Sequence, residues 1–308
     1  MSAVFEALAP IFLIIVAGLV MKRRQLVPDS FWGPCEMLTF YVFFPALLVD
    51  STARADLSDV DVVGMGGAML GGTLAAAALL LLVRPWVAKD SPAFTSVFQG
   101  AVRINTYVGL AAVSALYGTE GKALMAVGII SIVPLINVMA VLVLHRWGSG
   151  GRKGWRHVLL SLAKNPLLLA VLIGLALNAA GIHTITVVSP LMQALGAAAL
   201  PLGLLAVGAG LDLAAVRRSG AGLVWSSVVR LVMVPAITAA LGIWAGLDTV
   251  PLAVIVLYNG LPTSAASYVQ SRLMGGDHAL MAGIITAQTL AAAVTLPICL
   301  LLVGGVPG

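Results

Sequence analysis

Apolar residues in this 308-residue chain gather in long runs that short polar connections separate. About 20 apolar residues in a row are enough for an α-helix to cross a bilayer. Ten such runs can be read as ten transmembrane helices. They cover residues 4–21, 32–50, 60–83, 92–117, 122–145, 158–180, 187–211, 220–245, 249–271 and 278–303. The pattern therefore predicts an all-α polytopic membrane protein.

Composition agrees with a chain that uses a bilayer as its solvent. Hydrophobic residues make up 60% of the chain and charged residues only 9%, and the mean hydropathy is +1.07. These values exclude an ordinary soluble enzyme, a disulfide scaffold and a disordered chain. The two cysteines, Cys35 and Cys299, each lie in an apolar run and are read as buried small hydrophobes. No phosphate loop, metal cluster or catalytic triad is evident, so we expect no enzyme, cofactor or metal site.

The basic residues are concentrated in every second connection between the apolar runs. Odd-numbered connections hold twelve lysines and arginines, and even-numbered ones hold only Arg54 and Lys122. By the positive-inside rule, the odd connections are cytoplasmic, and both termini lie on the extracytoplasmic side of the bacterial inner membrane. The net charge of +5 then reflects topology, and nucleic acid is not expected as a partner. The twelve are Lys22, Arg23, Arg24, Arg84, Lys89, Arg146, Arg152, Lys153, Arg156, Arg217, Arg218 and Arg272.

The two halves of the chain align at a constant offset. Pro10 and Gly18 align with Pro166 and Gly174 at an offset of 156 residues. The segment around Pro45 aligns with the one around Pro201 at the same offset. A chance match of apolar segments is the alternative. If the repeat is real, residues 1–150 and 151–308 form two five-helix repeats, and an odd helix number makes them inverted. Inverted repeats are typical of secondary transporters.

Such transporters bind substrate near the membrane midplane, at interrupted helices in corresponding places of the two halves. The fourth and ninth runs carry the most polar central stretches, and the offset maps Pro262 onto Thr106. Proline and glycine favour a helix break, which frees backbone groups and exposes a half-helix N-terminus that attracts anions. The predicted substrate site comprises Arg103, Asn105, Thr106, Tyr107, Asn259, Gly260, Pro262, Thr263 and Ser264.

Arg103 is the most informative residue of this set. A charge at the bilayer centre costs at least about 2.5–3.5 kcal/mol and needs a partner. One interpretation is that Arg103 offsets a substrate carboxylate. The other is that it binds carbonyls freed by the helix break, or reaches Glu36 or another carboxylate near a run end. A substrate role for Asn259 predicts that Asn259→Ala lowers affinity more than folding stability.

Other polar residues in the runs carry weaker signals. Asn137, Thr286 and Gln288 are expected to make interhelical hydrogen bonds, or to form a secondary polar or ion site. Arg230, about a third of the way into the eighth run, is expected to snorkel to the interface. Gly67 and Gly71 form a pair spaced for close helix packing.

Several segments together resemble the auxin efflux carrier family, whose bacterial members include malonate and other carboxylate permeases. The resemblance spans nearly the whole chain. It rests on residues 43–48, 99–110, 117–118, 133–138, 164–167, 201–211 and 274–277.

The resemblance implies two inverted five-helix repeats whose broken helices, the fourth and ninth, cross at the midplane. It also implies an elevator-type mechanism. Helices 1, 2, 6 and 7 would form a scaffold that makes a homodimer, and helices 3–5 and 8–10 would form the moving domain. Asn105 and Asn259 correspond to asparagines that bind the substrate carboxylate in plant members. The chain lacks a proline in its fourth-run break and a long central loop, which argues against auxin and plant-type regulation.

These observations predict a secondary transporter of small organic anions, mono- or dicarboxylates, in the lipid bilayer. A sodium-coupled organic-anion symporter of the bile-acid type is the nearest alternative, and sodium-dependent uptake would favour it. A non-transporting membrane sensor is the alternative from another class, and substrate binding without flux would favour that.

Overall fold

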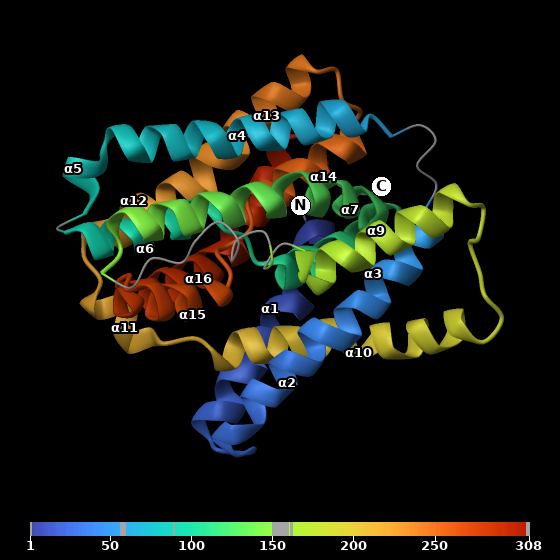
Figure 1. The fold of residues 1–308 in the computed structure, drawn as a ribbon, viewed down its shortest axis with the longest axis horizontal. Helices are drawn as coiled ribbons and strands as arrows, with labels where there is room; N and C mark the ends of the chain where they lie inside the picture. Colours follow the sequence, from blue (N-terminus) through green and yellow to red (C-terminus); the bar gives the residue numbers. More distant parts are fainter. Residues whose placement is uncertain (1, 56–59, 89, 150–159, 161–162, 306–308) are drawn as a thin grey trace.

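The computed structural model describes residues 2–55, 60–88, 90–149, 160 and 163–305. Within these residues the chain is helical, without a strand (Figure 1). The first half contains α1 (Ser2–Arg23), η1 (Asp29–Phe31), α2 (Trp32–Leu38), η2 (Thr39–Phe43), α3 (Phe44–Ala53), α4 (Val62–Leu82), α5 (Arg84–Val87), α6 (Ser91–Val102) and α7 (Thr106–Trp147). The second half contains α9 (Pro166–Ala179), α10 (Val188–Ala209), α11 (Leu213–Arg218), α12 (Ala221–Val228), η3 (Val229–Met233), α13 (Val234–Trp244), α14 (Thr249–Asn259), α15 (Ala266–Met274) and α16 (His278–Leu302).

Every predicted run overlaps helix among the described residues. Seven helical segments of the described chain are long and apolar enough to cross a membrane, and one of these, Ser91–Trp147, covers two predicted runs. Two shorter apolar helices, Pro166–Ala179 and Thr249–Asn259, fall in the sixth and ninth runs. Large apolar side chains such as Leu82 and Trp244 are 75% and 86% exposed, as expected of surfaces that face lipid. The protein is therefore a multi-pass α-helical membrane protein, while ten crossings remain a prediction.

Some predictions fall outside the described residues. These are the basic residues Lys89, Arg152, Lys153 and Arg156, the beginning of the sixth run, and the boundary between the two halves.

The second and eighth runs each contain one wide helical turn just before a proline. In the second run the π-helical segment η2 precedes Pro45, and in the eighth run η3 precedes Pro235. A proline has no N–H to donate to the carbonyl one turn earlier, and a π-turn is a common local adjustment to this loss. The wide turn changes which way nearby side chains point, and Arg230 lies inside η3.

The helices pack in two groups. In one group, α1 packs on α10, and α3 packs on both α9 and α10. In the other, α4 packs on α13, and α14 contacts α4, α7 and α13. The long helix α7 bridges the groups through contacts with α1 and α3. Figure 1 shows α2 and α10 on one side of the molecule and α4 with α13 on the other.

Two glycines allow the closest approach within the first group. A Cβ atom on Gly208 of α10 would lie 1.8 Å from the carbonyl oxygen of Ile15, and one on Gly18 of α1 would lie 2.1 Å from that of Leu205. Only residues without a side chain fit at these points, so the backbones of α1 and α10 touch directly.

Candidate functional site

The fourth and ninth runs are both interrupted, as the sequence predicts. In the fourth run α6 ends at Val102, the backbone of Arg103 is extended, and α7 begins at Thr106. In the ninth run α14 ends at Asn259 and α15 begins at Ala266. The two breaks touch, because the N–H of Asn105 donates to the carbonyl of Pro262 at 2.8 Å. Two segments far apart in sequence thus meet at a point where both helices lose their regular hydrogen bonds.

Asn105 caps the helix that restarts after the first break. Its Oδ1 accepts hydrogen bonds from the backbone N–H groups of Tyr107 at 3.1 Å and Val108 at 3.4 Å. These are donors that the first turn of a helix leaves without partners. The Nδ2 of Asn105 is buried and has no partner among the described residues. A donor is therefore available at the N-terminal, electropositive end of α7.

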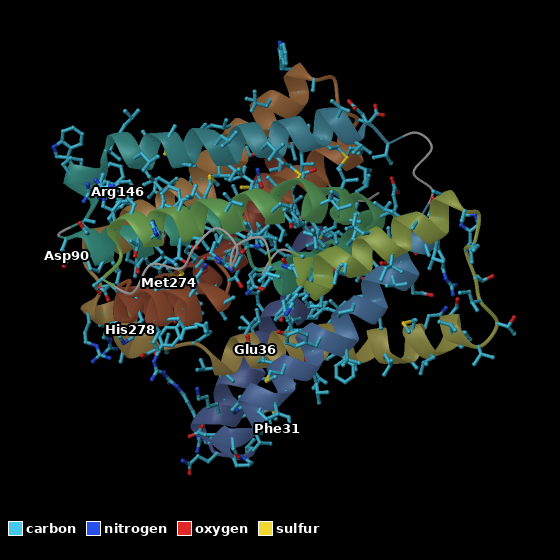
Figure 2. The ribbon with its side chains drawn as sticks, viewed as in Figure 1. Phe31, Glu36, Asp90, Arg146, Met274 and His278 are labelled. Atoms are coloured by element: carbon cyan, nitrogen blue, oxygen red, sulfur yellow. The ribbon has the colours of Figure 1, made fainter. Side chains whose placement is uncertain are left out.

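A cavity of about 460 Å³ lies beside the first break. It is bounded by α2 on one side and α15 on the other, and Figure 2 labels Glu36 of α2 and Met274 of α15 among its lining residues. Ala206 and Val207 of α10 and Leu167 of α9 complete the wall. Six predicted residues line it: Arg103, Asn105, Thr106, Tyr107, Asn137 and Ser264.

Arg103 brings a positive charge to this cavity without a paired carboxylate. Its Nη1 donates to the side-chain oxygen of Gln270, a neutral amide, and its Nε has no partner among the described residues. The one ion pair within 4.0 Å that the described residues form joins Arg54 to Asp50. Neither freed carbonyls nor Glu36 hold Arg103, so its charge is available to a ligand.

Tyr107 lines the cavity together with two other aromatic residues, Phe40 and Tyr41. Its ring stacks on Phe44 of α3, with the centroids 4.4 Å apart and the planes 4° from parallel. Because Phe44 is fully buried, the stacking fixes the orientation of Tyr107. The cavity thus combines a cation, amides and a flat apolar surface, which together fit a small organic anion.

Two polar residues of the cavity are absent from the predicted substrate site, although Glu36 was considered as a partner for Arg103. Glu36 lines it from α2, and Gln270 lines it from α15. Helical spacing could have indicated Glu36. Gly33, Glu36 and Phe40 are three and four residues apart, so they lie on one face of a helix. Gln270 lies within the ninth run, where a long polar side chain is unexpected unless it faces protein or water.

Except for Ser264, the predicted residues of the second break do not line this cavity. The Nδ2 of Asn259 donates to the carbonyl of Met69 at 3.1 Å and to Thr238 Oγ1 at 2.7 Å, and its side chain is fully buried. Gly260, Pro262 and Thr263 are buried as well. Packing of α4 and α13 against the break is what keeps Asn259 away from the cavity. Ser264 is the one member of the predicted 259–264 set that reaches it.

Arg230 and Gln288 close the second break from two sides. Arg230 is fully buried and donates to the carbonyls of Leu261 at 2.7 Å and Tyr258 at 3.2 Å. The expectation that it snorkels is wrong, because the freed carbonyls hold its guanidinium inside the protein. Gln288 accepts from the N–H of Thr263 at 2.9 Å and donates to the carbonyl of Gly100 at 3.0 Å.

The predicted secondary polar residues are not brought together. Asn137 lines the cavity, whereas Gln288 joins the two breaks. Thr286 accepts from the backbone N–H of Asp212 at 2.8 Å and so links α16 to the segment before α11. The described residues contain no group of three His, Cys, Asp or Glu side chains that could hold a metal ion.

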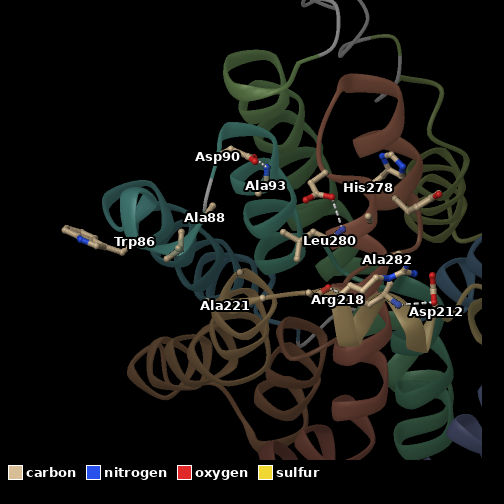
Figure 3. Close-up of a pocket in the computed structure, with 18 of the residues that line it drawn as sticks. Trp86, Ala88, Asp90, Ala93, Asp212, Arg218, Ala221, His278, Leu280 and Ala282 are labelled. Atoms are coloured by element: carbon tan, nitrogen blue, oxygen red, sulfur yellow. Dashed lines mark hydrogen bonds between the residues drawn. The ribbon is translucent and has the colours of Figure 1, made fainter.

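A second cavity, of about 690 Å³, lies at the ends of α6, α11, α12 and α16 (Figure 3). Its three carboxylates all cap helices. Asp90, Asp212 and Asp277 accept from the N–H groups of Ala93, Ala214 and Leu280 at 2.8–2.9 Å. Since capping explains these residues, the cavity at the first break is the better candidate site.

Comparison with known proteins settles the family. The sequence model described as membrane transport protein matches residues 3–300. The chain belongs to the membrane transport protein family. This family is the one that the resemblance to auxin efflux carriers named, so that prediction is confirmed. An uncharacterized transporter from Methanothermobacter thermautotrophicus is 22% identical over 295 residues, which cover 95% of this chain and 96% of that protein.

Membership in the membrane transport protein family gives the cavity its context. The protein is a membrane transporter, and the cavity is lined by residues of α2, α7, α9, α10 and α15. A transporter needs a binding site that it can expose to either side of the membrane. A polar cavity beside two interrupted helices is suited to that task.

Proposed function

We propose that the protein is an inner-membrane secondary transporter of small organic anions, mono- or dicarboxylates, that binds them beside the first helix break. One observation carries the proposal: Arg103 lines a cavity without a carboxylate partner. A cation at membrane depth is costly unless something offsets it, and a substrate carboxylate would do so. The free Nδ2 of Asn105 and the N-terminus of α7 add donors aimed at the same anion.

Alternating access would use the two packed groups. The first group contains the helices expected of the scaffold, α1, α3, α9 and α10, and the second contains helices expected of the moving domain. The cavity has walls from α9 and α10 of the first group and from α15, which belongs to the ninth run and so to the expected moving domain. A displacement of the moving domain against the scaffold would carry the site across the membrane. Ten crossings in two inverted repeats, both termini outside, and a scaffold homodimer belong to this proposal.

The orientation of the cavity fits a carrier open to the cytoplasm. Gly33 and Met274, which both line it, lie near helix ends that carry or adjoin the basic residues Arg24 and Arg272. The positive-inside rule assigns these ends to the cytoplasmic side. In the opposite state of the cycle, the same polar residues would face the outside.

Uptake into proteoliposomes tests the proposed function. A panel of radiolabelled mono- and dicarboxylates is offered with a sodium gradient, a pH gradient and a membrane potential imposed one at a time. We expect saturable uptake of at least one acid by the wild type and none by Arg103→Ala. Folded protein that neither binds nor moves any acid would overturn the organic-anion proposal. Binding without flux would favour a sensor.

A cross-link across the cavity tests the elevator step separately. Met37 of α2 and Val269 of α15 line opposite walls. With Cys35 and Cys299 replaced by serine, cysteines at 37 and 269 are joined by a flexible bismaleimide. We expect the joined protein to bind the acid and lose transport, while either single-cysteine protein treated alike retains it. Transport by the joined protein would contradict movement between these walls.

A further inference from the structure

The second helix break carries a charge that the proposed binding site does not use. Arg230 is fully buried in η3, and it contacts the break through two hydrogen bonds to carbonyls. Its Nη1 has no partner among the described residues, and no carboxylate lies within 4.0 Å of it there. A buried cation without a counter-ion is expensive, so its presence in the membrane interior calls for an explanation.

The need for hydrogen bonds accounts for one of the two contacts. In an unbroken helix the carbonyl of Tyr258 would accept from residue 262, but residue 262 is proline and has no N–H. Arg230 Nη2 donates to that carbonyl at 3.2 Å. A neutral donor such as glutamine could make this bond without a charge, so hydrogen bonding alone does not explain an arginine.

The position of Arg230 is one that favours a cation. Its guanidinium lies at the C-terminal end of α14, where the helix dipole is negative, and against carbonyls that point out of the break. In transporters with discontinuous helices, unwound carbonyls and half-helix C-termini coordinate the coupling cation. Asn259 Oδ1, also buried and without a partner among the described residues, belongs to the same break.

We infer that Arg230 is a tethered cation: its guanidinium permanently occupies the carbonyl cluster of the second break, where a dissociable sodium ion would otherwise bind. The carrier therefore keeps a positive charge near the crossing in every state and works without sodium at this site. Arg230 is a positioning residue. It holds the 260–265 segment, whose Pro262 carbonyl binds Asn105 and whose Ser264 lines the cavity.

The inference deepens the proposed function and rests on it for the role of the charge in transport. The occupancy of the carbonyl cluster can be tested without any organic acid. Removing the guanidinium while keeping the carbonyls and Asn259 should leave oxygen ligands for a small cation. A sodium ion should then stabilise the altered protein and not the wild type.

The experiment measures thermal unfolding of purified protein in NaCl and in KCl of equal ionic strength. We expect no difference between the salts for the wild type or for Arg230→Lys, which keeps the charge. For Arg230→Ala we expect Tm to be about 5 °C higher in NaCl than in KCl. Arg54→Ala is the matched control, because it removes an arginine whose partner is Asp50, and it should show no preference between the salts.

Two results would overturn the inference. One is selective stabilisation of the wild type by sodium, which would mean that a dissociable ion already binds. The other is a folded Arg230→Ala protein that does not respond to sodium. If Arg230→Ala does not fold, Arg230→Gln replaces it, since glutamine keeps a donor and removes the charge. Selective stabilisation of the wild type by sodium would overturn the inference whichever variant is used. If either result is obtained and the wild type still takes up the acid, the inference about Arg230 is wrong and the proposed function is unaffected.

Discussion

The two helix breaks look alike in sequence and differ in the structure. Each follows a half-helix, each contains an asparagine, and they touch through the bond from Asn105 to Pro262. The first break faces a cavity, and its cation Arg103 is partly exposed and bonded to one neutral amide. The second break is sealed over residues 260–263, and its cation Arg230 is fully buried among carbonyls. One break is built to meet a ligand and the other to hold the first in place.

The difference comes from what packs against each break. Met69 of α4, Thr238 of α13 and Gln288 of α16 all bond to residues of the second break. Across from the first break lie α2 and α15, and the cavity separates them. A polar residue in a membrane helix therefore indicates a site or a structural contact depending on its neighbours, which the local sequence does not contain.

Removal of the first cation should have the largest effect on binding. We expect Arg103→Ala to weaken acid binding about 100-fold, because a hydrogen bond to a charged group is worth about 1.5–3 kcal/mol. Tm should change little, since the side chain makes one bond to Gln270. Isothermal titration and thermal unfolding of the same preparation measure both. Unaltered affinity would remove Arg103 from the site, and an unfolded variant would assign it a structural role.

The asparagine of the second break should affect stability instead. Asn259→Ala leaves the Met69 carbonyl and the Thr238 hydroxyl without the amide donor, and we expect a loss of about 2 kcal/mol in the free energy of unfolding. Acid affinity should stay within about twofold of the wild type, because the side chain does not line the cavity. Asn105→Ala is the matched comparison and should lower affinity more than stability.

This expectation for Asn259 is the reverse of the one drawn from sequence and family resemblance. Acid binding about tenfold weaker at unaltered Tm would restore Asn259 to the substrate site. The test thus decides between the resemblance and the packing seen in this conformation.

Much of the fold could be predicted because hydrophobic runs and their breaks are local properties. The ten runs overlap helices among the described residues, and the two breaks fall at the polar stretches around Asn105 and Pro262. The candidate site could be predicted only in part. Arg103 stood out as a charge in an apolar run, but Glu36 and Gln270 enter the cavity through the packing of α2 and α15, which no local pattern reveals.

Arg230 shows why the rest of the site could not be predicted from the sequence. Sequence reasoning assigned the freed carbonyls to Arg103 as one of two alternatives, and the structure gives them to Arg230. The two arginines are both single charges in apolar runs. Which one meets the carbonyls depends on the π-turn before Pro235 and on the contact of η3 with the second break, both of which are tertiary features.

A smaller effect should separate two glycines of α4 beside the sealed break. A Cβ atom at Gly72 would lie 2.2 Å from Thr238 Oγ1, whereas one at Gly67 would meet nothing within 4 Å. We expect Gly72→Ala to lower the free energy of unfolding by about 1.5 kcal/mol, because Thr238 must shift and its bond to Asn259 with it. Gly67→Ala should be neutral or slightly stabilising. Equal effects in chemical unfolding would contradict the packing of α4 on α13.

The smallest effect concerns the carboxylate that shares the cavity with Arg103. Glu36 lines the cavity, so it should repel an anionic ligand, and Glu36→Gln should tighten acid binding about threefold. Repulsion in a water-accessible cavity is screened, which keeps the expected gain below about 1 kcal/mol. Glu120→Gln, an exposed carboxylate outside the cavity, is the control and should alter nothing.

The pH dependence of binding makes the role of Glu36 sharper. As pH falls, protonation of Glu36 should remove the repulsion and strengthen binding to the wild type, and this rise should be absent in Glu36→Gln. Weaker binding by Glu36→Gln at every pH would contradict repulsion and show that the carboxylate orients the ligand. Intact binding with lost uptake would indicate that Glu36 carries a proton through the cycle. The cavity beside the first break would then hold both the anion site and the coupling group, and the second break only the fixed charge.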